Sequence, residues 1–526
     1  MHKSKRKRVN HKGYPLFFTT RFMKFSFNIK ITVLFFLCLF LRFFFVDKYL
    51  ENEDSINFAM GLHDYDISLH QPHFPGYPVY IFLASLFLKI FHSDVAALTL
   101  PGVFFGSLTI FPLSFLTRSM FAEKTAILTA ILYTINPLCW MQSERPASDT
   151  TGTFFILLSI KFLFSAFDAA RYGACTLNYG KNASVSYHLF WRVKKNAHLY
   201  GGYCLFFGSL FLGIGLGVRL SYFPFVLLWM GTLLYYAFHR IHLEMNSIFF
   251  GITGLFAGIC LWFIPQINYT GITPFFYHAF SFTHGHFTDW GGSVLTFGGW
   301  ERVLCIVRPF LELELGDWRH TLYYLSVIQF AIAVLSILFA FRFFPADGKR
   351  FFCIMYAVPY TIWIIFGQNV ANTRHFLPLL PLILMFIAFG LGKICEVWGK
   401  RLFLILVITL IIATSSLSLT AIIQHRRSVP ASTQLIQYIK THFKNTSVRI
   451  YCFDGKKRFF DYYLPHWDAR NVREVPDIYF DLQSSLVNPE TILIVKKGKN
   501  NPLSDKQFSH IVTFEGFSLF EISQKN

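Results

Sequence analysis

The sequence predicts an α-helical protein that crosses a membrane many times, followed by a small C-terminal α/β domain. Of its 526 residues, 54% are hydrophobic, 65 are Phe and only 15% are charged. A bilayer core about 30 Å thick requires roughly 20 apolar residues for each helical crossing. Stretches of this kind recur as far as Gln424. The composition therefore excludes a soluble enzyme and predicts about 11–13 transmembrane helices.

The basic residues follow the pattern of a membrane protein. The formal net charge is +19, but Lys and Arg lie in short clusters between apolar runs, as in cytoplasmic loops. We therefore expect no nucleic-acid partner. The nine Cys are scattered and form no CxxC pair, which argues against a disulfide framework or a zinc–thiolate site.

The chain divides into three parts. Residues 1–28 form a basic tail, which we expect to be cytoplasmic because its charges lie too far from the apolar run at 29–46 for an ordinary signal peptide. Residues 29–423 form the membrane domain. Residues 424–526 are less apolar and form the α/β domain, with strands predicted at Val448–Phe453, Thr491–Val495 and His510–Ile522 and an amphipathic helix at Pro430–His442.

Loop charges decide the predicted topology. The apolar runs that favour a crossing are 29–46, 96–117, 124–141, 150–168, 199–217, 220–238, 247–267, 322–342, 351–367, 376–393 and 402–423. The run Val79–Phe91 is short and follows Pro78. If it lies at the interface or re-enters, the basic loops, including 169–197, all become cytoplasmic. The outer face then carries 47–78, 142–149, Arg219, 268–321, 369–375 and 424–526.

The first outer loop holds the leading candidates for chemistry. Glu53 and Asp54 lie beside a membrane helix, where a carboxylate can take a proton from an acceptor or bind a divalent metal. The alternative is a solvated acid that caps a helix. His70 and His73 belong to a Pro-rich turn. They can bind phosphate, transfer a proton or ligate a metal, or they are ordinary polar residues of a stiff turn.

Further candidates lie in other predicted outer segments. Glu144, Arg145 and Asp149 form a second charged cluster, in which Arg145 can bind an anionic group and Asp149 can share a metal with Asp54. The alternative is a helix cap by Ser148 or Asp149.

The remaining candidates carry cationic or imidazole groups. Arg374 and His375 stand at an outer helix end, where the positive-inside rule makes an Arg unusual, and Arg219 is a weaker case of the same kind. His284 and His286, with Asp289 nearby, would share one face of a strand and offer a metal or phosphate pair.

The order of these elements resembles the GT-C class of polytopic glycosyltransferases, in particular its protein O-mannosyltransferase and aminoarabinose-transferase branch. The resemblance covers roughly residues 29–400. It rests on the first outer loop with Asp54, on His70-Gln-Pro-His-Phe-Pro-Gly-Tyr-Pro78 before a hydrophobic helix, on Ser143-Glu-Arg-Pro-Ala-Ser-Asp149, and on Arg374-His-Phe-Leu-Pro378.

The resemblance implies an inverting transfer of a sugar from a polyprenyl-phosphate donor on the outer face. Asp54, with Glu53 beside it, would match the catalytic acid of the first loop, acting as base. Asp149 would match the second acid, and Asp54 with Asp149 could hold a divalent metal. Some relatives carry Lys in the turn and this chain does not. We therefore expect the donor phosphate and sugar to be bound by polar and cationic residues of the outer loops, namely His70, Gln71, His73, Arg145, Arg374 and His375.

Other functions remain open at the level of sequence. A transporter or flippase for lipid-linked or polar solutes is the alternative that the many helices and Gly-rich segments favour. For a transferase, the acceptor is a protein, a lipid or a glycan. The expected location is the bacterial inner membrane with the site on the periplasmic face, and the endoplasmic reticulum membrane is the alternative.

Overall fold

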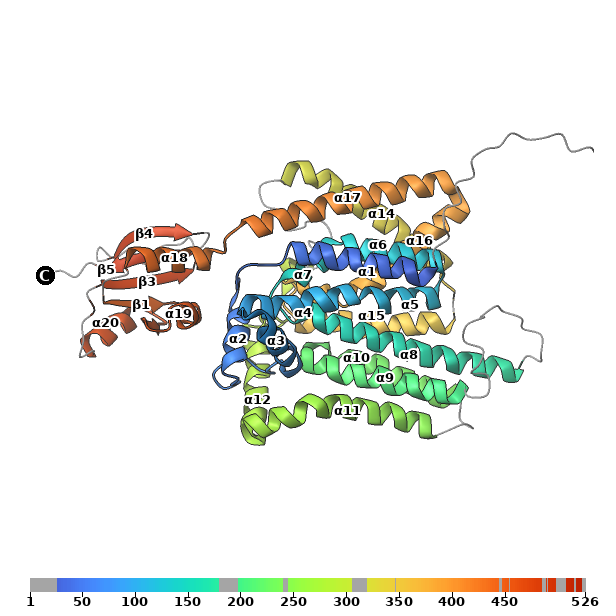
Figure 1. Ribbon diagram of the computed structural model, residues 1–526, viewed down its shortest axis with the longest axis horizontal. Helices are drawn as coiled ribbons and strands as arrows, with labels where there is room; N and C mark the ends of the chain where they lie inside the picture. Colours follow the sequence, from blue (N-terminus) through green and yellow to red (C-terminus); the bar gives the residue numbers. More distant parts are fainter. Residues whose placement is uncertain are drawn as a thin grey trace, which may run out of the picture.

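The computed structural model combines a bundle of long helices with an α/β domain that extends from one end of the bundle (Figure 1). The structure describes residues 26–178, 197–239, 245–304, 319–345, 347–443, 447–453, 455–484, 489, 491–497, 508–514 and 517–522. Most of the predicted basic tail and the centre of the predicted 169–197 loop lie outside these residues. The predicted fold class, a polytopic helical protein with a C-terminal α/β domain, is confirmed.

The membrane part begins with eight helices that run to the first gap. They are α1 (Phe27–Phe44), α2 (Glu53–His63), α3 (Pro78–Phe91), α4 (Asp94–Leu108), α5 (Ile110–Met120), α6 (Glu123–Ile135), α7 (Pro137–Glu144) and α8 (Asp149–Asn178). The second half contains α9 (Ala197–Val218), η2 (Leu220–Tyr222), α10 (Phe225–His239), α11 (Met245–Thr270), α12 (Ile272–Thr288), α14 (Arg319–Phe343), α15 (Gly348–Gly367), η3 (Thr373–Phe376), α16 (Leu380–Trp398) and α17 (Lys400–Arg427).

Among the described residues, nine helices are long and apolar enough to cross a membrane. They coincide with nine of the predicted runs. The predicted span at 124–141 is divided into α6 and α7 at Asn136, whose side chain caps α7, and Pro137 occupies the first helical position. The predicted span at 220–238 forms η2 and the short helix α10. The predicted run at 96–117 comprises α4 and α5, so the structure contains the predicted helices with three of them in shorter pieces.

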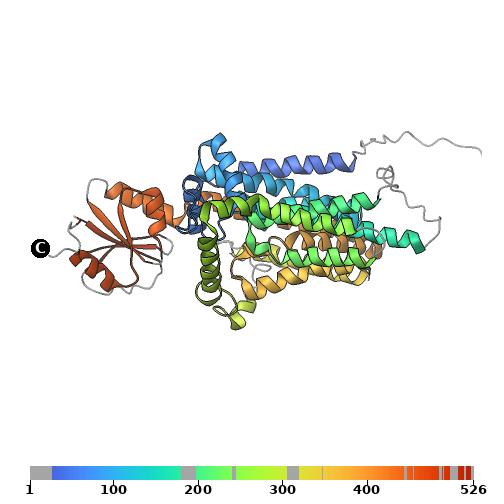
Figure 2. The ribbon, with the colours of Figure 1, turned by 90° about the horizontal axis from the view of Figure 1, so that it is seen from below.

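Two groups of loops lie at opposite ends of the bundle. At one end, Lys349 donates to the carbonyl of Met120 over 2.8 Å, and Lys30 pairs with Glu123 over 3.4 Å. The other end carries α2, α3 and the C-terminal domain (Figure 1). There α3 packs against α2, α4 and α9. The α12 helix lies across the direction of the long helices at this same end (Figures 1 and 2). The segments that loop charges assigned to one face therefore do lie together.

The C-terminal domain is a five-stranded sheet covered by helices on both faces. Its strands are β1 (Val448–Cys452), β2 (Asp468–Asn471), β3 (Thr491–Lys497), β4 (Phe508–Phe514) and β5 (Phe517–Ile522), in the order β2-β1-β3-β5-β4. β1 is parallel to β2 and β3, whereas β5 is antiparallel to β3 and β4. The helices are α18 (Ala431–His442), α19 (Lys457–Tyr463) and α20 (Val475–Ser484). Alternate residues of β1 face α19 and α20, as the period of two requires.

The sequence predicted part of this domain correctly. The strands at 448–453 and 491–495 and the helix at 430–442 are present. The single strand predicted at His510–Ile522 is wrong, because β4 and β5 are two strands that pair with each other. Gly516, which stands between them in the sequence, is the turn-forming residue type that the prediction overlooked.

Glycines allow α9 and α11 to pack closely inside the bundle. A Cβ atom on Gly258 would lie 2.3 Å from the carbonyl oxygen of Leu210 and 3.0 Å from the Cα of Gly213. A Cβ atom on Gly254, one turn earlier, would collide with the Phe206 carbonyl oxygen in the same way. This is the small-residue packing by which membrane helices approach each other.

We expect Gly258→Ala to destabilise the bundle because the added methyl group meets backbone atoms that have no side-chain freedom. The free energy of unfolding should fall by about 1–3 kcal/mol, measured as a lower melting temperature of the detergent-solubilised protein. Gly392→Ala is the matched control, since a Cβ atom there meets nothing within 4 Å. Equal melting temperatures for the two variants would contradict this account of the α9–α11 contact.

Candidate active site

Four charged side chains from four distant segments form a continuous chain of ion pairs. Arg374, in η3, lies between two carboxylates: its Nη2 is 2.8 Å from Asp54 Oδ2, and its Nη1 is 4.0 Å from Asp149 Oδ2. Arg219 follows α9, and its Nη1 is 3.2 Å from the same Asp149 oxygen. Because the charges alternate in sign, each carboxylate lies against at least one guanidinium. The cluster can therefore stay ionised in a largely buried place.

Local structure fixes both carboxylates. Asp54 lies in the first turn of α2, where Asn52 and Ser55 form a capping box and the helix dipole favours an anion. Asp149 begins α8, and the hydroxyl of Tyr222 donates to its carbonyl oxygen over 3.0 Å. Tyr222 approaches this closely because residue 152 is Gly, where a Cβ atom would lie 2.7 Å from the Tyr222 ring. The acids are thus held by their helices before any ligand arrives.

Several buried polar atoms of this cluster have no hydrogen-bond partner among the described residues. They are Asp149 Oδ1, Arg374 Nε and Arg219 Nε. A buried donor or acceptor without a partner costs about 1–3 kcal/mol, so such atoms are uncommon unless they serve a ligand. The two arginine nitrogens are donors suited to the oxygens of a phosphate group.

His73 borders the site on the side where aromatic rings pack. Its ring stacks on Phe282 of α12, with 5.6 Å between centroids and 16° between planes. Its Nδ1 lies 3.9 Å from Asp54 Oδ1, and its Nε2 lies 3.0 Å from the hydroxyl of Tyr77. Burial lowers the pKa of His73 to about 4, against the attraction of Asp54, which would raise it. The imidazole is therefore neutral at pH 7.

Asp54 is ionised at neutral pH. Burial by itself would raise its pKa, but the positive charges of His73, when protonated, and Arg374 lower it by more, so the pKa lies below the ordinary value. At pH 7, where His73 is neutral, Arg374 provides the contact that holds this carboxylate charged. Any group that competes for Arg374 would therefore make Asp54 a stronger base.

Other predicted residues of the first loop lie near the site without joining the ion-pair chain. Glu53 pairs with Lys456 of the C-terminal domain. His70 is exposed and has a left-handed backbone, with φ of 57°. Gln71 pairs through its backbone with Asp66, and its buried Oε1 has no partner among the described residues. His375 is buried next to Arg374, and its carbonyl accepts from Tyr360 over 3.2 Å.

Arg145 and Glu144 belong to a second charged cluster. Arg145 Nε lies 3.4 Å from Glu51 Oε2, and Glu51 Oε1 lies 2.8 Å from His425 Nε2 near the end of α17. Asp47 Oδ2 lies 3.4 Å from the same His425 nitrogen. Glu144 accepts from Trp140, and its carbonyl oxygen accepts from the Asp47 amide. Arg145, which the sequence predicted to bind the sugar donor, therefore pairs with Glu51 and not with Asp54 or Asp149.

Two places in the structure bear on the predicted binding of a metal ion. Within the described part of the chain, Asp47, Glu51 and His425 form the one group of three or more His, Cys, Asp or Glu side chains close enough to share an ion. Arg145 already pairs with Glu51 there. Between Asp54 and Asp149 lies the positively charged guanidinium group of Arg374. The two carboxylates therefore cannot share a divalent metal ion while Arg374 stays in place.

The prediction that His284 and His286 share a strand face is wrong. Both residues lie in α12, where positions two apart point in different directions. His286 Nε2 contacts the carbonyl of Gly367 at 2.7 Å, whereas His284 lies near Thr288. The apolar pattern of residues 272–282, with aromatic residues at helical spacing, was the signal for a helix.

Sequence reasoning missed the residues that support the charged chain. Tyr77, Tyr222 and Phe282 contact His73 or Asp149, and no motif marks them. Arg219, which the sequence favoured only weakly, is a full member of the chain. Its signal was its position directly after an apolar helix on the face where positive residues are unusual.

Known proteins with a similar fold are found by comparison. Residues 70–178 match the family model described as dolichyl-phosphate-mannose-protein mannosyltransferase. No curated protein sequence matches the chain. Crystal structures of ArnT from Cupriavidus metallidurans are similar over almost the whole of both chains. The apo form has a TM-score of 0.59 at 12% identity and covers 94% of this chain and 98% of that one. The form bound to undecaprenyl phosphate has a TM-score of 0.56 at 12% identity, covering 94% and 97%.

The chain has the GT-C fold. At the level of the fold, the predicted resemblance to the GT-C glycosyltransferases is confirmed, and residues 70–178 add a match to a mannosyltransferase family model. The matched segment 70–178 contains His73 and Asp149, whereas Asp54, Arg219 and Arg374 lie outside it. Three of the four residues of the ion-pair chain therefore lie outside the family match.

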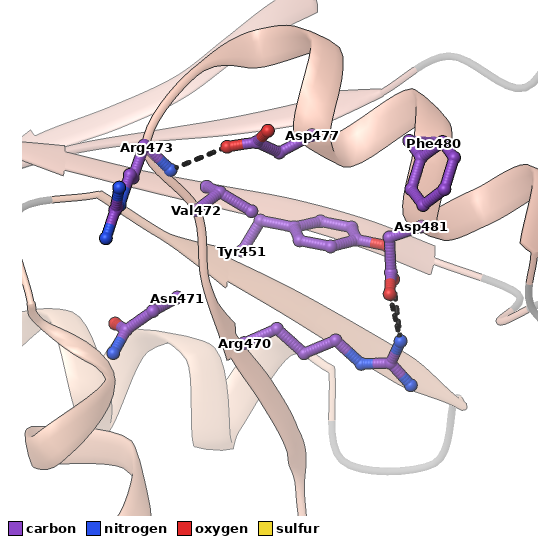
Figure 3. A pocket seen from close by; sticks show the side chains of 8 residues that line it. All are labelled: Tyr451, Arg470, Asn471, Val472, Arg473, Asp477, Phe480 and Asp481. Carbon is purple, nitrogen blue, oxygen red and sulfur yellow. Dashed lines mark hydrogen bonds and ion pairs between the residues drawn. The ribbon is translucent and has the colours of Figure 1, made fainter.

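A pocket of about 430 Å³ lies in the C-terminal domain, between the β2 edge of the sheet and α20 (Figure 3). Asp481 accepts from the hydroxyl of Tyr451 over 2.6 Å and from Arg470 over 2.7 Å. The backbone amide of Arg473 donates to Asp477. The carboxylates of this pocket, Asp477 and Asp481, therefore accept hydrogen bonds from the domain itself. Several buried atoms around Arg374, by contrast, have no partner among the described residues.

The buried neutral His73 predicts loss of stability in acid. The unfolded chain takes up a proton on this residue as pH falls through about 6.5, whereas the folded protein does so only near pH 4. Between pH 7 and pH 5 this difference should remove about 2 kcal/mol from the free energy of unfolding.

The measurement is the fall in melting temperature of the solubilised protein between these two pH values. It should be smaller for His73→Gln than for wild type. His466→Gln, which changes an exposed histidine of the C-terminal domain, should leave the fall unchanged. An equal fall in all three proteins would refute a buried neutral His73.

Proposed function

We propose that the protein is an integral membrane glycosyltransferase that transfers a sugar from a polyprenyl-phosphate donor to an acceptor with inversion at the anomeric carbon. The observation that carries the proposal is the Asp54–Arg374–Asp149–Arg219 chain, with unpaired buried donors on both arginines. The GT-C fold and the match of residues 70–178 to a mannosyltransferase family support it. So does ArnT, of the same fold, which was crystallised with undecaprenyl phosphate.

The reaction needs a cation for the leaving group and a base for the acceptor. The acceptor oxygen attacks the anomeric carbon as the bond from that carbon to the phosphate oxygen breaks, and the lipid phosphate leaves with the bonding electrons. Arg374 and Arg219 can neutralise the charge that develops on the phosphate. Asp54 takes the proton from the acceptor hydroxyl. Asp149 is held by both arginines and serves to orient them.

Donor binding would itself activate the base. Asp54 is bonded to Arg374, which keeps its pKa low. A phosphate that takes the Arg374 donors removes this stabilisation of the carboxylate, so the pKa of Asp54 rises and the carboxylate becomes a stronger base. Asp54 then becomes an effective base only when the polyprenyl-phosphate sugar is bound. The acceptor is therefore not deprotonated when there is no sugar to transfer.

The arrangement of charges favours a transferase over a transporter. The four charged groups lie at the end of the bundle that carries α2 and the C-terminal domain (Figure 1). Transporter sites usually lie near the midplane of the bilayer at interrupted helices. We propose that this end faces the periplasm of a bacterial inner membrane, because basic pairs lie at the opposite end of the bundle, namely Lys349-Arg350 at the start of α15 and Lys400-Arg401 at the start of α17. The acceptor is a protein, lipid or glycan hydroxyl, and the sugar is a hexose or a pentose.

Substitution of Asp54 tests this proposal directly. Asp54→Asn keeps the size of the side chain but removes the base, so the rate of sugar transfer from a polyprenyl-phosphate donor should fall by about 10²–10⁴-fold. The measurement is transfer of labelled sugar by purified protein in liposomes. Asp64→Asn, an exposed acid at the other end of α2, is the matched control and should keep wild-type activity. Wild-type activity in Asp54→Asn would overturn the role of Asp54 as base.

Chelation tests the alternative of a metal at Asp54 and Asp149. Because guanidinium groups already lie against both carboxylates, we expect transfer to persist after dialysis against EDTA. Loss of transfer that Mg²⁺ or Mn²⁺ restores would show that a metal takes part, either at Asp54 and Asp149 or at the group of Asp47, Glu51 and His425.

A further inference from the structure

The C-terminal domain contacts the loop that carries the proposed base. Its helix α19 packs on α2, and Phe459 and Phe460 share one buried apolar cluster with Leu50, Ile56 and Ala59 of the first loop. These residues are separated by some four hundred positions in the sequence, yet they form a single core. The domain is therefore joined to the membrane part by more than the α17 connection.

Polar contacts reinforce this interface at two points of the first loop and at the start of α4. Lys456 forms an ion pair with Glu53, and Arg458 donates to the carbonyl of Leu69. Tyr462 donates to Asp94 Oδ2 over 2.6 Å at the start of α4. The side chain of Lys456 is 13% exposed and that of Glu53 is 41% exposed, so solvent screens this ion pair in part.

The start of the same loop is held by the helix that leads into the C-terminal domain. His425, in the last turn of α17, contacts Glu51 at 2.8 Å and Asp47 at 3.4 Å. The loop is thus fixed by C-terminal residues both before and within α2.

The first turn of α2 connects the domain to the proposed site. Glu53 and Asp54 are adjacent, and consecutive residues of an α-helix point about 100° apart. Glu53 therefore meets Lys456, while Asp54 meets Arg374 on a different side of the same turn. A movement of this turn towards or away from the C-terminal domain changes the distance between Asp54 and Arg374.

We propose that Lys456 is a positioning residue for the transfer reaction: by holding Glu53, the C-terminal domain sets the place of Asp54 relative to Arg374. This inference rests on the proposed function. It gives the domain a part in catalysis and assigns Glu53 an anchoring role next to the base. A misplacement of about 1 Å in a catalytic group can cost about 10²-fold in rate.

The test compares two adjacent lysines of the full-length protein. Lys456→Met removes the contact between the domain and α2, whereas Lys457→Met removes a charge that pairs with Asp461 within α19. We expect the kcat of Lys456→Met to fall about 10-fold or more, with the KM for the polyprenyl-phosphate sugar nearly unchanged. Lys457→Met should stay within about twofold of wild type, because it removes only a partly exposed pair within one helix and no contact with α2.

A charge exchange separates positioning from general loss of stability. Glu53→Lys and Lys456→Glu should each lower kcat, and the double variant should recover most of the rate, since it restores the pair with reversed charges. Failure of the double variant to recover, or wild-type kcat in Lys456→Met, would overturn the proposal.

Hydrogen exchange gives a readout that does not depend on activity. Amides of residues 53–63 should exchange faster in Lys456→Met than in wild type and Lys457→Met, because α2 loses its anchor. Unchanged exchange would overturn the anchoring role even if kcat fell. If wild-type protein transferred no sugar, the proposed function would fail, while the exchange comparison would still decide whether Lys456 holds α2.

Discussion

The contact on which the site depends is the guanidinium of Arg374 between the carboxylates of Asp54 and Asp149. Removing charged groups from water costs several kcal/mol for each ion unless opposite charges and hydrogen bonds compensate. Arg374 and Arg219 provide this compensation for two acids that are held on the ends of separate helices. The same guanidinium groups present unpaired donors to a ligand. One arrangement therefore compensates the two buried acids and leaves cationic donors unpaired, as the proposed binding of a donor phosphate requires.

This contact constrains the rest of the membrane domain. Asp54, Asp149, Arg219 and Arg374 come from segments that meet only if the intervening helices return the chain to the same end of the bundle. The short helix α3 helps to satisfy this requirement, since it stays at that end beside α2 and α4. Close packing through Gly254 and Gly258 joins α11 to α9, the helix that Arg219 follows. The apolar residues around His73 limit water near the charges, and this keeps their mutual attraction strong.

The C-terminal domain changes how the first loop is understood. Seen as sequence, Glu53 and Asp54 form one acidic pair with one role. In the structure they point to different partners, Lys456 and Arg374, because helix geometry separates neighbours. The same loop receives His425 at its start. A loop between two membrane helices would otherwise be among the more mobile parts of the molecule, and here the C-terminal contacts reduce that freedom.

The sequence by itself determined the membrane class, most of the helices and the α/β nature of the last hundred or so residues, and it singled out Asp54 and Arg374 as candidates, because hydrophobic length and loop charge are local properties. Only the tertiary structure decided the partners. It joined Arg219 to Asp149, turned Arg145 towards Glu51 and Glu53 towards Lys456, and placed His284 and His286 on a helix. These outcomes depend on contacts between residues far apart in the chain. The pairing of buried charges is set by where helices place their ends, which the pattern of any one segment does not contain.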